Sequence, residues 1–151
     1  MVRPGGSFYY PLEQEVPHDE LVMIAGGVGI NVFCSILDYL HRLPPNPALQ
    51  IKLLYGSKAS ELLFLERFTA FSAKLPNLHI QLYLTGNTAS EQPFDSEARR
   101  MTMGDIQQAI PRPHSSLVYI CSTPAMTDEV EEYCLRKMGM QKNRVITEKW
   151  W

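Results

Sequence analysis

The stretch that decides the fold is Leu21–Gly29, which reads LVMIA followed by GGVG. Five consecutive apolar residues are typical of a strand that is buried on both faces of a parallel sheet. Glycines at the end of such a strand allow backbone conformations and close approaches that side chains prevent. If a helix follows, the free N–H groups of its first turn favour an anion at the same point. This order of elements makes a nucleotide phosphate the first candidate ligand.

Strand-like and helix-like segments alternate along the rest of the chain. Apolar runs predict further strands at 49–55, 78–84, 117–121 and 144–147. Helical spacing of apolar residues predicts helices at 30–40, 60–75, 102–110 and 123–138. Residues 86–100 are polar and are expected to form a surface loop. The βαβαβαβαβ order predicts an α/β fold: an open parallel sheet of five strands with helices on both faces.

Local signals indicate where two of these helices begin. Thr102 with Asp105 three residues later has the pattern of a capping box. Thr123 is a favourable N-cap, and Pro124 fits the first helical position that follows it. Gly139 comes just after the last helix, where a left-handed residue commonly ends a helix.

Length and composition exclude several classes of protein. The 151 residues suffice for one domain with its own core. A net charge of −2 gives no reason to expect nucleic acid or a membrane surface as partner, and no apolar run approaches the roughly 20 residues of a membrane-spanning helix. Residues 1–20, rich in Pro, Gly and charge, are predicted to be a tail, or the end of another unit, ahead of a domain at 21–151. Scattered histidines and cysteines predict no metal site and no disulfide framework.

Two strand ends carry the candidate binding residues. The turn Gly26–Asn31 (GGVGIN) lacks the third glycine of the dinucleotide-binding fingerprint. It is either a phosphate-binding turn or a turn that needs glycine only for its backbone. The segment Cys121–Met126 (CSTPAM) follows the strand at 117–121. With no histidine placed to activate it, Cys121 is favoured as the wall of a ligand crevice, with a buried inert thiol as the alternative.

The chain closes with two adjacent tryptophans, Trp150 and Trp151. Two indoles at the end of a chain expose a large apolar surface unless they dock on something. They are expected either to pack on their own domain or an oligomer contact, or to cover a planar cofactor.

Four motifs in this order resemble the pyridine-nucleotide domain of ferredoxin–NADP reductase-type flavoproteins. They are GGVGI at 26–30, YGSK at 55–58, CSTPAM at 121–126 and EKWW at 148–151. The resemblance extends over residues 5–151, and four ordered motifs are far more specific than any one of them.

The resemblance implies an oxidoreductase domain that binds NAD or NADP as cofactor. The diphosphate would lie on Gly27–Gly29, the adenine ribose near Ser57 and Lys58, and the nicotinamide beside Cys121. The implied cofactor-binding residues are Gly26, Gly27, Val28, Gly29, Ile30, Asn31, Ser57, Lys58, Cys121, Ser122, Thr123, Pro124 and Met126. The residues implied at the point of hydride transfer are Cys121, Glu148, Trp150 and Trp151.

The sequence departs from the family pattern in three respects. Val32 stands where the family has proline, and Ser122 where it has glycine. If Ser122 had a positive φ, its side chain would cost about 1–2 kcal/mol. The third departure is that the motifs of a flavin-binding barrel are missing, apart from Gly5–Phe8, which resembles the end of its last strand.

The expected function is therefore the NAD(P)H-binding half of a flavin-dependent oxidoreductase, with FAD only if a flavin domain is supplied elsewhere. A flavin domain or an electron-acceptor protein is the implied partner. The alternative is a non-catalytic nucleotide-binding or interaction module. The resemblance suggests a mitochondrial location and the sequence, with no targeting segment, otherwise a cytoplasmic one.

Overall fold

The computed structural model describes residues 10, 16–86 and 93–149. Its strands are β1 (Glu20–Gly26), β2 (Gln50–Lys58), β3 (Leu78–Thr85), β4 (Asp95–Glu97), β5 (Ser116–Cys121) and β6 (Val145–Thr147). Its α-helices are α1 (Ile30–Arg42), α2 (Leu65–Lys74), α3 (Met103–Ala109) and α4 (Pro124–Glu132). None of the described helices is long and apolar enough to cross a membrane.

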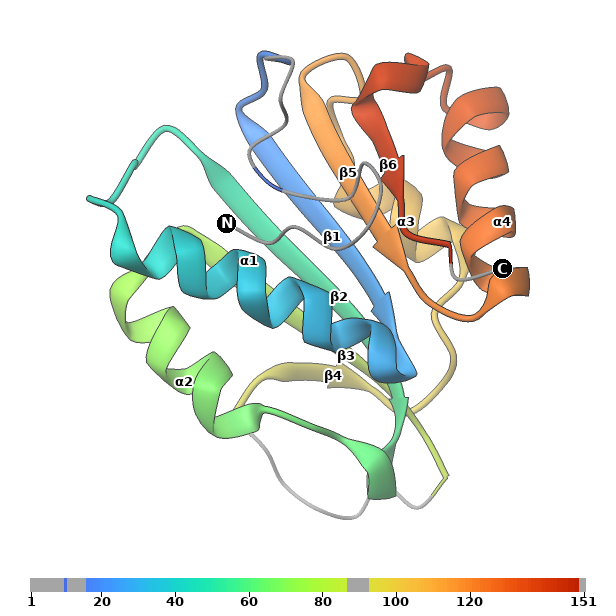
Figure 1. Cartoon of the computed structure of the whole chain (residues 1–151). Helices are drawn as coiled ribbons and strands as arrows, with labels where there is room; N and C mark the ends of the chain where they lie inside the picture. The colour runs from blue at the N-terminus through green and yellow to red at the C-terminus, as the bar shows by residue number, and fades with distance from the viewer. Residues whose placement is uncertain (1–9, 11–15, 87–92, 150–151) are drawn as a thin grey trace.

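All strands of the described residues are parallel and form one sheet in the order β4-β3-β2-β1-β5-β6. Helices α1 and α2 cover one face, and α3 and α4 cover the other (Figure 1). The chain builds outward from β1 to β4 and then returns through α3 to β5, on the opposite side of β1. The direction of winding therefore reverses between β1 and β5.

Strand β1 is central because it is buried on both faces. Leu21, Met23 and Ala25 belong to the core beneath α1 and α2, whereas Val22 and Ile24 belong to the core beneath α3 and α4. Alternation with a period of two is what a strand imposes on its side chains. The continuous apolar run predicted this position correctly.

The predicted number of strands was wrong: the sheet has six strands, not five. The additional strand β4 lies within the predicted loop and pairs Leu82 of β3 with Ser96 and Tyr83 with Glu97. Its sequence is Asp-Ser-Glu, and all three residues are exposed. An edge strand without apolar alternation leaves no signal in the sequence.

Two element boundaries also differ from expectation. Helix α2 begins at Leu65 rather than at Ser60, because Phe64 adopts a left-handed conformation with φ of 67° and Ser60 lies in a separate 3-10 turn. Helix α4 ends at Glu132 and continues as a π-helical turn, Tyr133–Lys137. The positive φ of Gly139, 67°, and the capping box of α3 are confirmed.

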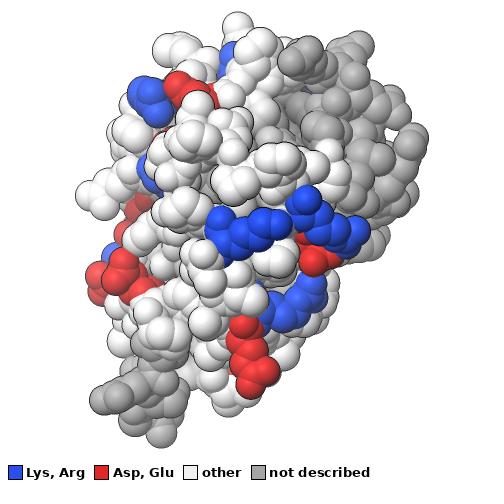
Figure 2. All heavy atoms as spheres, turned by 90° about the vertical axis from the view of Figure 1, so that its left-hand side faces the viewer, with Lys and Arg blue, Asp and Glu red and all other residues white. Residues whose placement is uncertain are grey.

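On the side of the molecule that lies to the left in Figure 1, basic and acidic side chains lie side by side (Figure 2). Arg42 forms an ion pair with Asp38 one helical turn earlier. The guanidinium of Arg67 lies over the rings of Phe64 and Phe71, 5.6 and 5.5 Å from their centroids. These cations are therefore engaged within the chain.

The described residues ahead of β1 contribute to the core. Tyr10 and Val16 are buried against the α1 side of the sheet. The Tyr10 ring meets Tyr119 of β5 edge-on, with centroids 6.0 Å apart, and its hydroxyl is 3.1 Å from Nε2 of His18. The domain boundary at residue 20 stays a prediction, but this part of the predicted tail packs on the domain.

The turn between β1 and α1 lies directly against the end of β5. A Cβ on Gly29 would overlap the carbonyl oxygen of Cys121 and lie 2.7 Å from its carbonyl carbon. Both are backbone atoms, which cannot move aside without shifting the strand. Glycine is therefore required at position 29 for packing, and the angle φ of −58° shows that conformation is not the reason.

A buried polar cluster lies at the opposite end of β1. Glu20 is 2% exposed; its carboxylate is 3.2 Å from Nζ of Lys52 and accepts a hydrogen bond of 3.0 Å from the Ser116 hydroxyl. The Lys52 ammonium also donates to the Ala109 carbonyl, at 2.8 Å. This cluster ties β1 to β2, β5 and the end of α3.

We predict that Gly29→Ala destabilises the fold by about 1–3 kcal/mol, because the added methyl group overpacks a rigid contact. Urea denaturation measures the change. Gly104→Ala is the matched control: a methyl group there meets only Thr102 Oγ1 at 3.5 Å, and alanine favours the helix. Equal stability of Gly29→Ala and the wild type would contradict the assigned contact.

We predict that Glu20→Gln lowers the free energy of unfolding by about 2 kcal/mol, because it leaves Lys52 without its buried counter-charge. The control is Glu132→Gln. Its ion pair with Arg136, at 3.7 Å, is exposed on both sides, and its loss should cost less than about 0.5 kcal/mol. Urea titrations that place both variants at the same midpoint would exclude a role for the cluster.

Candidate functional site

A crevice opens at the carboxyl ends of β1, β2 and β5, where the winding of the sheet reverses. Helix α1 leaves β1 toward one face, and α4 leaves β5 toward the other, so the sheet edge between them is uncovered. In open α/β sheets this is the position where ligands bind. The crevice consists of two adjoining lobes that share Gly26, Gly27, Ser122 and Thr123.

The first lobe, here called the β2-side lobe, has a volume of about 430 Å³. Ser57 and Lys58 line it from the end of β2, and Met126 lines it from α4; their predicted contacts with a nucleotide stay a prediction. The other residues around it are Ala25, Gly56, Glu61, Tyr83, Thr85, Arg100, Met101 and Glu129.

The second lobe, here called the glycine-side lobe, has a volume of about 380 Å³. It lies between the turn Gly26–Gly29 and the segment Ser122–Pro124. The structure therefore brings together the two motifs that the sequence places almost a hundred residues apart. They meet because β1 and β5 are neighbours in the sheet.

The glycine turn presents backbone toward the crevice. Gly27 has a φ of 57°, and a Cβ there would meet nothing within 4 Å, so the space in front of it is open. The N-caps of the turn and of α1 are Gly26 and Gly29, which have no side chain to accept from the turn's N–H groups. An anion can approach these groups directly. The dipole of α1 favours negative charge at the same point.

Three other residues of the first motif have distinct positions. Val28 at the tip of the turn is 76% exposed. The Asn31 amide donates to the Val28 carbonyl at 2.9 Å and so braces the tip. Ile30 is fully buried in the core, and its N–H bonds within the turn. The Ile30 side chain thus supports the turn from behind.

Ser122 and Gly26 fit together across the crevice floor. A Cβ on Gly26 would overlap Oγ of Ser122 and lie 3.0 Å from its Cβ. Among the described residues other than glycine only Phe64 has a positive φ, so Ser122 carries none of the backbone strain considered above. Its N–H donates to Oγ1 of the buried Thr127 at 3.1 Å, which fixes the turn.

The predicted start of the last helix is confirmed. Thr123 is the N-cap of α4 and accepts from the N–H of Met126 at 3.4 Å, and Pro124 occupies the first turn. Because this cap already satisfies an N–H group, α4 offers less free donor capacity than the uncapped α1.

Cys121 is fully buried and belongs to the core on the α1 side of the sheet, behind Gly29. It lines neither lobe, so its role beside a nicotinamide stays a prediction. The other two thiols, Cys34 and Cys134, are also buried in the core. Burial raises the pKa of Cys34 to about 11 and that of Cys134 to about 12.

The last described residues continue from β6 toward the end of β5. The N–H of Glu148 donates to the Ile120 carbonyl at 3.1 Å, and the residue is 6% exposed. Burial raises the pKa of its carboxyl above the ordinary value. Trp150 and Trp151 lie outside the described residues, so their predicted part at the flavin is a prediction still.

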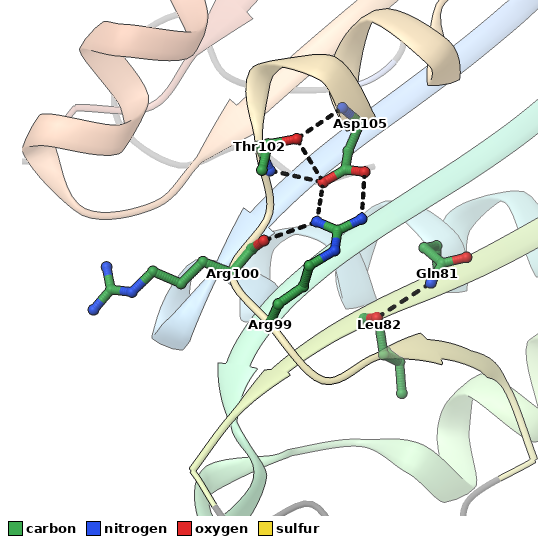
Figure 3. A network of polar contacts seen from close by, with 6 residues as sticks. All are labelled: Gln81, Leu82, Arg99, Arg100, Thr102 and Asp105. Atoms are coloured by element: carbon green, nitrogen blue, oxygen red, sulfur yellow. Dashed lines mark hydrogen bonds and ion pairs between the residues drawn. The ribbon is translucent and has the colours of Figure 1, made fainter.

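Sequence reasoning missed the contribution of the segment before α3. Arg100 and Met101 reach the β2-side lobe from a stretch that reads as loop. The neighbouring Arg99 forms a two-pronged ion pair with Asp105, at 2.7 and 2.9 Å (Figure 3). The only sequence signal for this arrangement is the arginine pair directly ahead of the capping box.

No group of three or more metal-binding side chains occurs within the described ranges.

Comparison with known proteins agrees with this geometry. The family model described as the oxidoreductase NAD-binding domain matches residues 23–132. The human oxidoreductase NAD-binding domain-containing protein 1 is 35% identical over 99% of this chain and 51% of its own length; the bovine protein is 34% identical, over 99% and 52%. The chain thus spans about half the length of these curated relatives.

Solved structures show the same fold. The cytochrome b5 reductase domain of Ulva prolifera nitrate reductase has a TM-score of 0.76 at 20% identity, covering 97% of this chain and 58% of that one. The CS-b5R domains of human Ncb5or, in the NAD+ form, give 0.70 at 19% identity, covering 87% and 37%. With a family model that spans most of the chain and a two-lobed crevice at its switch point, the protein belongs to the oxidoreductase NAD-binding domain family.

Proposed function

We propose that the crevice binds NADH or NADPH and that the chain presents the reduced nicotinamide to a flavin held by another domain or protein. The observation that carries the proposal is the meeting of two lobes at a glycine turn in which Gly26, Gly27 and Gly29 present only backbone. A dinucleotide has the same plan, with two nucleoside halves joined by a diphosphate.

The residues present fit the diphosphate. Gly27 leaves open space in front of the backbone, and the first turn of α1 starts without a side-chain cap. No described acidic side chain lines the glycine-side lobe, since its walls are Gly26–Gly29 and Ser122–Pro124. The diphosphate would therefore meet N–H groups and a helix N-terminus without a nearby negative charge.

The residues that line the two lobes differ in charge, and this difference indicates which half of the dinucleotide each lobe binds. The β2-side lobe contains Lys58 and Arg100 and suits the adenosine half with its ribose oxygens. The glycine-side lobe has no charged residue in its lining and lies against the segment Ser122–Pro124 that follows β5. We therefore assign the nicotinamide half to the glycine-side lobe.

The chain's own residues would bind and orient, and the bound cofactor would supply the hydride that reduces the flavin. The turn Gly27–Gly29 anchors the diphosphate. Ser122, fixed through Thr127, forms the floor between the lobes. Glu148, whose pKa is raised by burial, would lie at the flavin side with Trp150 and Trp151. The similar Ulva structure is that of a cytochrome b5 reductase domain, which supports an electron-transfer role.

We predict that NADH or NADPH quenches the intrinsic tryptophan fluorescence saturably and that Gly27→Asn raises Kd about tenfold or more. Asparagine tolerates the left-handed conformation but places its side chain in the open space of the crevice. Gly139→Asn is the matched control, because Gly139 has a φ of 67° and also meets nothing within 4 Å. It should leave Kd unchanged.

Equal Kd values for Gly27→Asn and wild type would show that the diphosphate does not bind at the glycine turn. Absence of saturation by either nucleotide at millimolar concentration would overturn the proposed function itself.

We predict that the isolated chain oxidises NADPH with free FAD no faster than FAD alone does, because the proposal places the flavin in another domain or protein. The absorbance of reduced nicotinamide measures the rate. The matched reference is the same mixture with heat-denatured chain. A rate that rises in proportion to native chain would show that the chain uses free flavin, against the proposal.

A further inference from the structure

We propose that Arg100, together with Lys58, recognises a phosphate on the adenosine ribose, so that the crevice prefers NADPH to NADH. The inference rests on the proposed function and specifies the cofactor of the same site. It is carried by the position of Arg100, by the way its backbone is held and by the absence of a partner for its guanidinium among the described residues.

Arg100 lies across the end of β2 from the predicted ribose-binding residues. It lines the β2-side lobe with Ser57 and Lys58. The next residue, Met101, has its Cε 3.9 Å from the position of a Cβ on Gly56, so the side chain of this segment reaches the carboxyl-terminal part of β2. Residues from two separate connections therefore face the place where the adenosine ribose would lie.

The backbone of Arg100 is held by its neighbours. The Arg99 guanidinium binds both carboxylate oxygens of Asp105 and donates to the Arg100 carbonyl at 3.0 Å. Asp105 is itself fixed by the N–H of Thr102 at 2.7 Å in the capping box. The Arg99 group also lies 5.5 Å from the centre of the Tyr83 ring.

This network is ionised over the whole physiological range. The hydrogen bonds from Arg99 are the main reason that the pKa of Asp105 falls to about 2. The Asp105 carboxylate therefore binds Arg99 at every pH at which nucleotide binding is measured. The Arg99 guanidinium is therefore held by Asp105, whereas the Arg100 guanidinium takes no part in this network.

The Arg100 side chain points away from this network (Figure 3). Neither its guanidinium nor the Lys58 ammonium makes a hydrogen bond or ion pair with a described residue, whereas Arg99, Arg42 and Lys149 all have acidic partners. Two unpaired cations in one lobe favour a doubly charged phosphate, which an arginine binds in a two-pronged manner.

Neither acidic residue of the lobe stands at the position from which a carboxylate usually binds the hydroxyls of the adenosine ribose. In NAD-specific domains of this architecture, an acidic side chain near the end of the second strand binds the ribose hydroxyls, whereas arginine accommodates a 2′-phosphate. Here β2 ends in Lys58. Glu61 is the last residue of the 3-10 turn Ala59–Glu61 that follows β2, and Glu129 reaches the lobe from α4.

The test compares Kd for NADPH and NADH in wild type, Arg100→Gln and Lys58→Gln, by fluorescence titration at fixed salt. Wild type should bind NADPH about tenfold or more tightly than NADH. Arg100→Gln should weaken NADPH binding about tenfold and NADH binding less than about twofold. Lys58→Gln should act in the same direction.

The matched control is Arg42→Gln, which removes the same charge at the far end of α1, about 20 Å along the helix from the crevice. It should leave both Kd values unchanged. Adenosine 2′,5′-bisphosphate and AMP repeat the comparison without the nicotinamide half. Only the bisphosphate should lose affinity in Arg100→Gln.

If Arg100→Gln lost the same affinity for NADPH as for NADH, Arg100 would bind the diphosphate that both share. If it lost affinity for neither, Arg100 would not contact the nucleotide. Either result overturns the inference while the proposed function stands, as does tighter binding of NADH than NADPH by wild type. Failure of both dinucleotides to bind wild type would instead reject the proposed function.

Discussion

The structure depends on the close approach of the β1–α1 turn to the end of β5. Gly29 rests on the backbone of Cys121, and Gly26 leaves room for the Ser122 side chain. These two contacts allow α1 to start where β1 stops, in line with the edge of the sheet. A side chain at either position would push the turn away from β5. The crevice would then lose the surface that joins its two lobes.

Because the winding of the sheet reverses between β1 and β5, the strand ends at this contact stay open and form the ligand-binding crevice. Because α1 and α4 leave toward opposite faces, nothing in the sheet's own architecture covers the strand ends between them. The N-terminus of α1, with glycine caps, then faces an open space instead of a neighbouring side chain. The polar cluster around Glu20 secures the other end of the same strand. Both ends of β1 are thus fixed, and only one is open to a ligand.

The segment before α3 shows how a loop acquires a defined position. Asp105 serves the capping box and binds Arg99, so one carboxylate joins the helix start to the strand-end crevice. The Arg99 guanidinium is bound to Asp105, whereas the Arg100 side chain points away from this ion pair. The same short stretch thus contains one structural and one available guanidinium. Adjacent residues with the same chemistry differ because backbone geometry points their side chains in different directions.

The sequence alone determined the central strand, the glycine turn, the threonine caps of α3 and α4 and the family. Each of these depends on neighbours in the chain: an unbroken apolar run at Leu21–Ala25, glycines after it, a threonine ahead of a helix. Tertiary structure alone decided the sixth strand, the left-handed Phe64 that delays α2, the burial of Cys121 and the arrival of Arg100 at the end of β2. These features depend on contacts between distant segments, and a one-dimensional pattern of apolar and polar residues does not encode which distant backbone a side chain will meet.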